Sequence, residues 1–245
     1  MKRTLEWQIA TVKAIRQETA NVKTLTLALL KWVPHRPGQH YDIRLTAEDG
    51  YSAQRSYSIG SEPERHGEID ITVEPIRDGE VSPFLDDVVV VGDRFEVRGP
   101  IGGYFVWEAS DGGPLLLVAG GSGIVPLMAM ARHRAAVGAT VPARLLYSSR
   151  SFDDIIYRAD LDALANRDGL QVFHTLTRSQ PEGWQGFARR IDDRMVAEVN
   201  KPFGPKAQVF ICGPTALVET AADAAEAAGV AAERIKTERF GPTGA

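Results

Sequence analysis

The sequence predicts two domains of different fold class: a small antiparallel Greek-key β-barrel over residues 1–107 and a doubly wound parallel α/β sheet over residues 108–245. Three observations lead to this prediction. Up to about residue 105, short runs of alternating apolar and polar residues are separated by Gly, Pro, Asp and Glu. Later in the chain, apolar runs alternate with Ala-rich stretches of helical character. Between the two patterns lies WEASDGGP, a polar, Gly-rich segment typical of a domain boundary.

The first half is expected to contain closely spaced strands with one helical turn before the last of them. Such spacing is typical of a small antiparallel barrel or sandwich. The expected strands cover residues 7–15, 22–29, 40–46, 54–61, 69–76 and 93–99, and the helical turn covers residues 81–88.

The second half is expected to consist of βα units on a parallel sheet, since each apolar strand leads toward a helical stretch. The expected strands cover residues 114–121, 143–149, 170–177, 207–213 and 234–240, and the helices cover residues 125–138, 159–167, 194–200 and 215–229.

Composition and charge narrow the possible classes of function. The 245 residues are 44% hydrophobic, as a folded core requires, and 32 acidic against 28 basic residues give a net charge of -4. This balance offers no electrostatic footprint for nucleic acid. The start of the sequence has no apolar secretory signal, and the longest apolar run is too short to span a bilayer. We therefore expect a cytoplasmic protein without a membrane or nucleic-acid partner.

The sequence contains few candidate metal ligands. The single cysteine, Cys212, excludes an internal disulfide and cannot alone hold an iron–sulfur cluster or a structural zinc ion. His35 and His40 flank a Pro-Gly turn without a recognised ligand spacing, and we interpret both as turn or surface residues. No metal site is expected.

A glycine-rich loop joins the first strand of the second half to its helix. Small residues let the backbone approach a diphosphate, and the free amides of the helix start can bind an anion. Pro126 suits the first helical turn, where its missing N–H costs little. The alternative is a Gly-rich turn without function. The loop residues are Gly120, Gly121, Ser122 and Gly123.

Two further strand ends carry candidate nucleotide contacts. Ser148, Ser149 and Arg150 stand where dinucleotide enzymes often keep an acid for the adenosine ribose, so NADPH is favoured over NADH. The alternative, a solvated arginine, leaves NADH possible. The later strand ends in ICGP, which places Cys212 and Gly213 before Pro214; this cysteine is alternatively a small buried apolar residue.

The stretch RSYSIGS, residues 55–61, combines a cation, an aromatic ring and hydroxyls on one expected barrel strand. Its strict alternation places Arg55 and Tyr57 on one face, and Ser56 and Ser58 on the other. Alone, this pattern also fits an ordinary half-buried strand.

RSYSIGS, GEVSPFL, GGSGIVP and ICGP occur in an order and spacing that resemble the ferredoxin–NADP(+) reductase superfamily across nearly the whole chain. The resemblance implies an FAD-binding barrel followed by an NAD(P)-binding domain. Because there is one cysteine, the chain resembles a stand-alone member without a fused 2Fe-2S domain.

The resemblance implies that Arg55 binds the FAD diphosphate, that Tyr57 packs against the isoalloxazine ring and that Ser58 bonds near flavin N5. In the second flavin loop, Gly79 gives room while Val81 and Ser82 face the diphosphate, although Ser82 is alternatively a plain helix cap. The further flavin contacts that the resemblance implies are Ser56, Ile71, Val73, Glu80 and Phe240.

The nicotinamide side of the site is also assigned by resemblance. The catalytic residues implied are Ser58, Cys212 and Glu238; Glu238 lies in the closing segment ERFG, before a GPTGA tail. The pyridine-nucleotide contacts implied are Gly120, Gly121, Ser122, Gly123, Pro126, Ser149, Arg150, Thr177, Cys212, Gly213 and Pro214.

The function implied is hydride transfer from NAD(P)H to bound FAD, followed by release of single electrons to a separate iron–sulfur or haem protein. Ferredoxin-like proteins and oxygenase components are the partners expected, and the oligomeric state is left open. One alternative is a reductase of free flavins, which GEVSPFL disfavours. Another is a non-catalytic nucleotide-binding regulatory subunit, since fold alone does not establish turnover.

Overall fold

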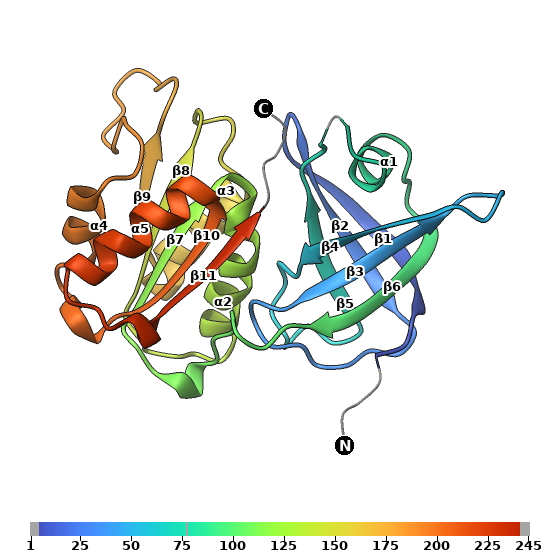
Figure 1. Cartoon of the computed structure of the whole chain (residues 1–245), viewed down its shortest axis with the longest axis horizontal. Helices are drawn as coiled ribbons and strands as arrows, with labels where there is room; N and C mark the ends of the chain where they lie inside the picture. The colour runs from blue at the N-terminus through green and yellow to red at the C-terminus, as the bar shows by residue number, and fades with distance from the viewer. Residues whose placement is uncertain (1–4, 77, 241–245) are drawn as a thin grey trace.

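A computed structural model describes residues 5–76 and 78–240 of the chain and confirms the predicted fold class. A barrel domain and an α/β domain lie side by side (Figure 1). Within the described residues, the barrel strands are β1 (Gln8–Thr19), β2 (Val22–Leu29), β3 (His40–Thr46), β4 (Ser52–Ser58), β5 (Glu68–Val73) and β6 (Arg94–Ile101), with the short helix α1 (Val81–Asp87) between β5 and β6.

The barrel is an antiparallel sheet in the order β4-β3-β6-β1-β2-β5. From Leu25 to Leu29 of β2, buried residues alternate with half-buried ones, because one face of the strand packs on the core. β4 and β5 are the two ends of this order, and they meet through the single bridge Ile59–Ile71. The barrel therefore closes at Ile59, one residue after β4 ends, and β4 itself forms no ladder with β5.

The second domain is a parallel sheet in the order β11-β10-β7-β8-β9. Its strands are β7 (Leu115–Gly120), β8 (Ala143–Ser149), β9 (Gln171–Leu176), β10 (Gln208–Pro214) and β11 (Ile235–Phe240). Its helices are α2 (Ile124–Ala136), α3 (Arg158–Asp168), α4 (Asp193–Asn200) and α5 (Thr215–Ala227).

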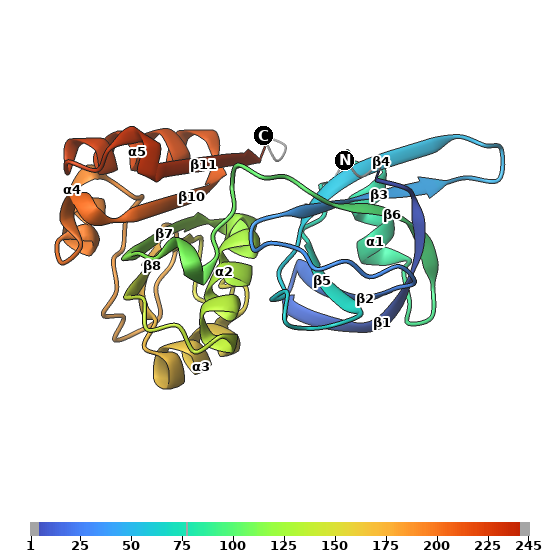
Figure 2. The same cartoon turned by 90° about the horizontal axis from the view of Figure 1, so that it is seen from below.

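Helices cover both faces of this sheet: α2 and α3 lie on one face and α4 and α5 on the other (Figure 2). Every residue of β7 is buried, as a central parallel strand requires. Two apolar clusters fill the space between the helices and the sheet, one on each face. The first cluster includes Trp107, which is fully buried and lies in the connection between β6 and β7.

The prediction that His35 lies in a turn or on the surface is wrong. The ring is 3% exposed, and its Nε2 atom is 2.9 Å from the carbonyl oxygen of Ser61. Burial lowers the pKa of His35. His40 begins β3 and is half-buried. Among the described helices, none combines the length and the apolar character needed to cross a membrane.

Candidate functional site

The edge of β4 is the first part of the site. β3 pairs with β4 from Ser52 to Ser58, but on its other side β4 has no regular ladder to β5. An edge strand of this kind presents backbone donors and acceptors to whatever lies beside it. The strand that carries Arg55, Tyr57 and Ser58 is therefore available to a ligand.

A tight turn before α1 lies next to this edge. The Gly79 N–H donates to the Ile76 carbonyl at 2.8 Å, and the Ile76 N–H donates to the Ser82 hydroxyl at 3.0 Å. A Cβ atom at Gly79 would lie 3.1 Å from both the Ile76 oxygen and the Ser82 hydroxyl, so glycine suits this turn. The hydroxyl of Tyr57 also lies beside Ser82, and burial raises the pKa of that tyrosine.

The first amides of α1 are not capped by a side chain. Glu80, at the N-cap position, makes no side-chain cap bond, and its carboxylate instead accepts a hydrogen bond from the Tyr51 hydroxyl at 2.9 Å. Arg55 is exposed on the neighbouring strand. A guanidinium beside free helix amides is a donor set that fits a diphosphate, which supports the contacts predicted for Arg55, Val81 and Ser82.

Three predicted flavin contacts have their side chains elsewhere. The Ser56 hydroxyl donates to Asp42 at 2.7 Å, and Arg98 donates to the other oxygen of the same carboxylate at 2.7 Å. Ile71 and Val73 are fully buried in the barrel core. These three side chains are therefore engaged within the barrel. The flavin contacts predicted for them stay predictions, and they would have to be made by backbone atoms.

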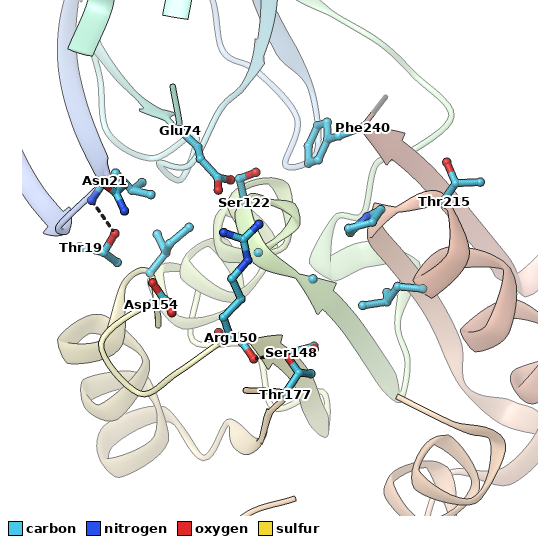
Figure 3. A pocket seen from close by; sticks show the side chains of 17 residues that line it. Thr19, Asn21, Glu74, Ser122, Ser148, Arg150, Asp154, Thr177, Thr215 and Phe240 are labelled. Atoms are coloured by element: carbon cyan, nitrogen blue, oxygen red, sulfur yellow. Dashed lines mark hydrogen bonds between the residues drawn. The ribbon is translucent and has the colours of Figure 1, made fainter. Parts of the chain in front are cut away.

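A cavity of about 580 Å³ lies between the two domains (Figure 3). The α/β domain contributes most of its walls, including predicted contacts on its five strands and the loops that follow them. These predicted residues are Gly120, Gly121, Ser122, Ser149, Arg150, Thr177, Pro214 and Phe240. The barrel contributes residues that the sequence analysis did not identify: Thr19, Asn21, Val22 and Glu74. No motif marks them, because they meet the loop only when the domains pack together.

Close backbone packing fixes the glycine-rich loop above β10. A Cβ atom at Gly123 would lie 2.1 Å from the Cys212 carbonyl oxygen, and one at Gly120 would lie 2.6 Å from the Leu217 side chain. Gly121 has a φ of 53°, in the left-handed region that glycine adopts readily. α2 starts immediately after this loop without a side-chain cap, so its first amides can bind an anion.

Arg150 and Ser149 lie on the α/β side of the cavity. In Figure 3 the Arg150 side chain extends across the cavity toward Ser122 and Glu74. Among the described residues, the buried Ser149 hydroxyl has no hydrogen bond of good geometry, and the hydroxyl of the nearby Tyr147 donates to the Gly121 carbonyl at 3.1 Å. A hydroxyl and a guanidinium at the end of one strand fit a phosphorylated ligand.

Thr177 connects the ends of two strands. Its backbone N–H and its hydroxyl both donate to the Ser149 carbonyl, at 3.0 and 3.2 Å. Thr177 therefore holds the loop that follows β9 against the cavity wall.

Cys212 and Glu238 face each other across neighbouring strands. They are register partners in β10 and β11, and the Cys212 Sγ atom is 4.0 Å from Glu238 Oε2. Burial raises the pKa of the Cys212 thiol well above its usual value, so the thiol is uncharged. Burial also raises the pKa of Glu238 to about 7. This carboxyl can therefore hold or release a proton near neutral pH.

Phe240 follows this pair and lies between the domains, at the cavity wall (Figure 3). Its position agrees with the predicted flavin contact, which stays a prediction. The GPTGA tail, residues 241–245, lies outside the described residues. Within those residues, no group of three His, Cys, Asp or Glu side chains is arranged to hold a metal ion.

Comparison with known proteins gives matches over both domains. The family described as oxidoreductase FAD-binding domain matches residues 9–106, and the family described as oxidoreductase NAD-binding domain matches residues 117–223. A glycine betaine monooxygenase reductase subunit from Pseudomonas aeruginosa is 32% identical over 238 residues, covering 95% of this chain and 63% of the relative.

A second relative, NADH-cytochrome b5 reductase 1 from Pyricularia oryzae, is 33% identical over 201 residues, covering 78% of this chain and 64% of the relative. This chain thus spans less than two thirds of the length of these relatives. The FAD/NAD-binding domain of a nitric oxide dioxygenase from Vibrio cholerae has the same fold, with a TM-score of 0.86, 23% identity and coverage of 96% of this chain and 99% of that one.

The raised pKa of Glu238 predicts a pH-dependent stability. The folded protein holds this proton up to about pH 7, whereas the unfolded chain loses it near the ordinary value of 4.5. Glu238 should therefore contribute a fall of roughly 3 kcal/mol in the free energy of unfolding as pH rises from about 4.5 to 7, while the buried His35 and His174, whose pKa values are lowered, act in the opposite direction. Glu238→Gln should remove this fall, as measured by urea unfolding across that range.

Glu226→Gln, at an exposed position on α5, is the matched control and should keep the wild-type pH profile. A Glu238→Gln profile as steep as that of the wild type would contradict the assignment.

Proposed function

The chain belongs to the FAD- and NAD-binding oxidoreductases of the ferredoxin–NADP(+) reductase superfamily, and from that premise we propose that it reduces bound FAD with NAD(P)H and passes the electrons singly to a redox partner. The supporting observation is the interdomain cavity. Glu74, which directly follows β5, lies on its barrel side, and Gly121 and Ser122 lie on its α/β side. A nucleotide bound there lies beside the gap between β4 and β5.

FAD, when bound, supplies a hydride acceptor that can return two electrons one at a time. Arg55 and the first amides of α1 bind its diphosphate, and the Tyr57 ring packs against its flavin. Ser58 offers a hydroxyl that donates or accepts a hydrogen bond at the reacting nitrogen. The chain thus contributes position and polarity, since hydride transfer itself needs no general base.

On the nucleotide side, the glycine-rich loop and Arg150 bind the phosphates of NAD(P)H. The neutral thiol of Cys212 is fully buried behind the cavity wall, which Pro214 of the same strand lines. Glu238, whose pKa is raised to about 7, holds or releases a proton at the same end of the sheet. The partial burial of Glu238 limits its contact with bulk water.

We propose that the electron acceptor is a separate protein, either an oxygenase component or an iron–sulfur or haem protein. The names of the relatives support this choice, since one is a reductase subunit of a monooxygenase and another a reductase of cytochrome b5. We also propose a cytoplasmic location, where reduced pyridine nucleotide is available as the electron donor.

The function is tested by recording the visible spectrum of the purified protein during separate anaerobic titrations with NADPH and NADH. We expect a flavin band that copurifies and is bleached by the nucleotide. Protein that is colourless even after FAD is added would contradict the proposal, and FAD that binds without bleaching would indicate a non-catalytic subunit. Protein that is purified without colour yet turns over added flavin would indicate a free flavin reductase.

Ser58→Ala should slow flavin reduction roughly ten- to a hundredfold while FAD stays bound, because one hydrogen bond to a group that gains charge is lost. Stopped-flow absorbance measures this rate. Ser52→Ala, at the exposed start of the same strand, is the control and should leave the rate unchanged. An unchanged rate in Ser58→Ala would exclude the role given to that hydroxyl.

Arg150→Gln should raise the KM for NADPH roughly tenfold or more and that for NADH much less, because a 2′-phosphate loses its cation. Arg167→Gln, exposed on α3 and absent from the cavity wall, is the control. An equal loss for both nucleotides would contradict the 2′-phosphate role and would place the guanidinium on the diphosphate that both nucleotides share.

A further inference from the structure

A closed set of polar side chains around Tyr157 joins the two domains. Tyr157 lies between β8 and α3 of the α/β domain, and its side chain is 1% exposed. Among the described residues it is the non-glycine residue with a positive φ, 61°. The left-handed conformation is unfavourable for a tyrosine, so its surroundings must hold it in place.

Hydroxyl groups form a line from Tyr157 into the barrel. The Tyr157 hydroxyl bonds to the Thr72 hydroxyl on β5. Thr72 bonds in turn to the Thr24 hydroxyl on β2 at 2.8 Å, and Thr24 donates to the Glu18 carboxylate on β1 at 2.6 Å. Three barrel strands are thus connected to one side chain of the other domain.

Charged side chains form a second connection from the barrel to the α/β domain. Arg16 donates to Glu18 at 2.8 Å and to Asp160 on α3 at 2.9 Å. Arg132 on α2 pairs with the same Asp160 carboxylate, and its guanidinium lies 4.7 Å from the centre of the Tyr157 ring. We call this closed set, formed by Arg16, Glu18, Thr24, Thr72, Arg132, Tyr157 and Asp160, the Tyr157 clasp.

The clasp also contacts the end of RSYSIGS. Arg132 donates to the Gly60 carbonyl at 2.6 Å. A Cβ atom at Gly60 would lie 2.5 Å from the Tyr157 hydroxyl oxygen, so the contact requires glycine. Gly60 stands two residues after Ser58, and the strand that carries the flavin contacts is therefore fixed to the α/β domain.

Each domain's clasp residues are close in sequence to a cofactor contact. Thr72 is two residues before Glu74, and Tyr157 follows Ile156; both Glu74 and Ile156 line the interdomain cavity. Arg132 lies on α2, the helix that begins at the glycine-rich loop. A change in the clasp therefore changes the separation between the flavin strand and the nucleotide loop.

We propose that the Tyr157 clasp sets the separation of the two domains at which nicotinamide and flavin touch, which makes Tyr157 and Thr72 positioning residues for hydride transfer. This inference rests on the proposed function. Ring contact tolerates little displacement, since an error of 1 Å can cost about a hundredfold in rate. The two cofactor sites are on different domains, so their separation depends on what holds the domains together.

The test compares flavin reduction in wild-type protein and in Tyr157→Phe, which keeps the ring and removes the hydroxyl. We expect the reduction rate in stopped-flow to fall roughly tenfold. The long-wavelength charge-transfer absorbance of the nucleotide–flavin pair should weaken, while FAD affinity stays unchanged. Thr72 keeps its bond to Thr24 in this variant, so the urea unfolding midpoint should change little.

Thr72→Val and the double variant separate positioning from stability. Thr72→Val leaves the buried Tyr157 hydroxyl unpaired and should lower the unfolding midpoint. Adding Tyr157→Phe removes that unpaired group and should restore the midpoint, but the reduction rate should stay low. Thr72→Ser keeps the hydroxyl and should keep the rate.

Thr26→Val is the matched control. Thr26 donates to Asp70 at 2.7 Å between the same strands, β2 and β5, but entirely within the barrel. The rate of flavin reduction and the charge-transfer band of the Thr26→Val variant should equal those of the wild type. Wild-type rates and charge-transfer bands in Tyr157→Phe and in the double variant would overturn the inference. A wild-type protein that NAD(P)H does not bleach would instead overturn the proposed function.

Discussion

The unpaired side of β4 is the constraint on which the barrel and its ligand site depend. A barrel of this strand order would close by a ladder between β4 and β5, yet the two strands share one bridge, at Ile59 and Ile71. Exposed backbone groups along an edge strand favour pairing with another molecule unless something covers them. The turn at Gly79 and the start of α1 lie beside this edge, and a dinucleotide between them would cover the remaining groups.

In the α/β domain, the proposed nucleotide site would place a doubly charged diphosphate in a cavity that also holds carboxylates. Glu74 and Asp154 line the cavity, and Arg150 is the cation that crosses it. One guanidinium cannot offset both carboxylates and a diphosphate, so most of the binding must come from backbone amides. This explains why the loop is built of glycines and packs so closely on Cys212.

Much of this arrangement was predictable from the sequence, because it depends on local patterns. The switch from alternating strands to βα units predicted both domains, and the two motifs RSYSIGS and GGSGIVP lie at the edge strand β4 and at the wall of the interdomain cavity. What could not be predicted depends on contacts between distant residues. His35 is buried with its ring against the carbonyl of Ser61, 26 positions away, and the hydroxyl of Ser56 donates to Asp42 on the neighbouring strand β3.

The contacts between the domains were the least predictable part, because they join residues that are distant in the sequence. They are also the contacts on which the proposed mechanism depends most. Thr19 and Glu74 belong to ordinary barrel strands and turns until the second domain packs against them. No sequence motif marks Tyr157. Its role is inferred only from the combination of a left-handed backbone, a buried ring and the contact with Gly60. In a protein that keeps two cofactors on two domains, local sequence can specify each binding site, but the distance between the sites is a property of the interface alone.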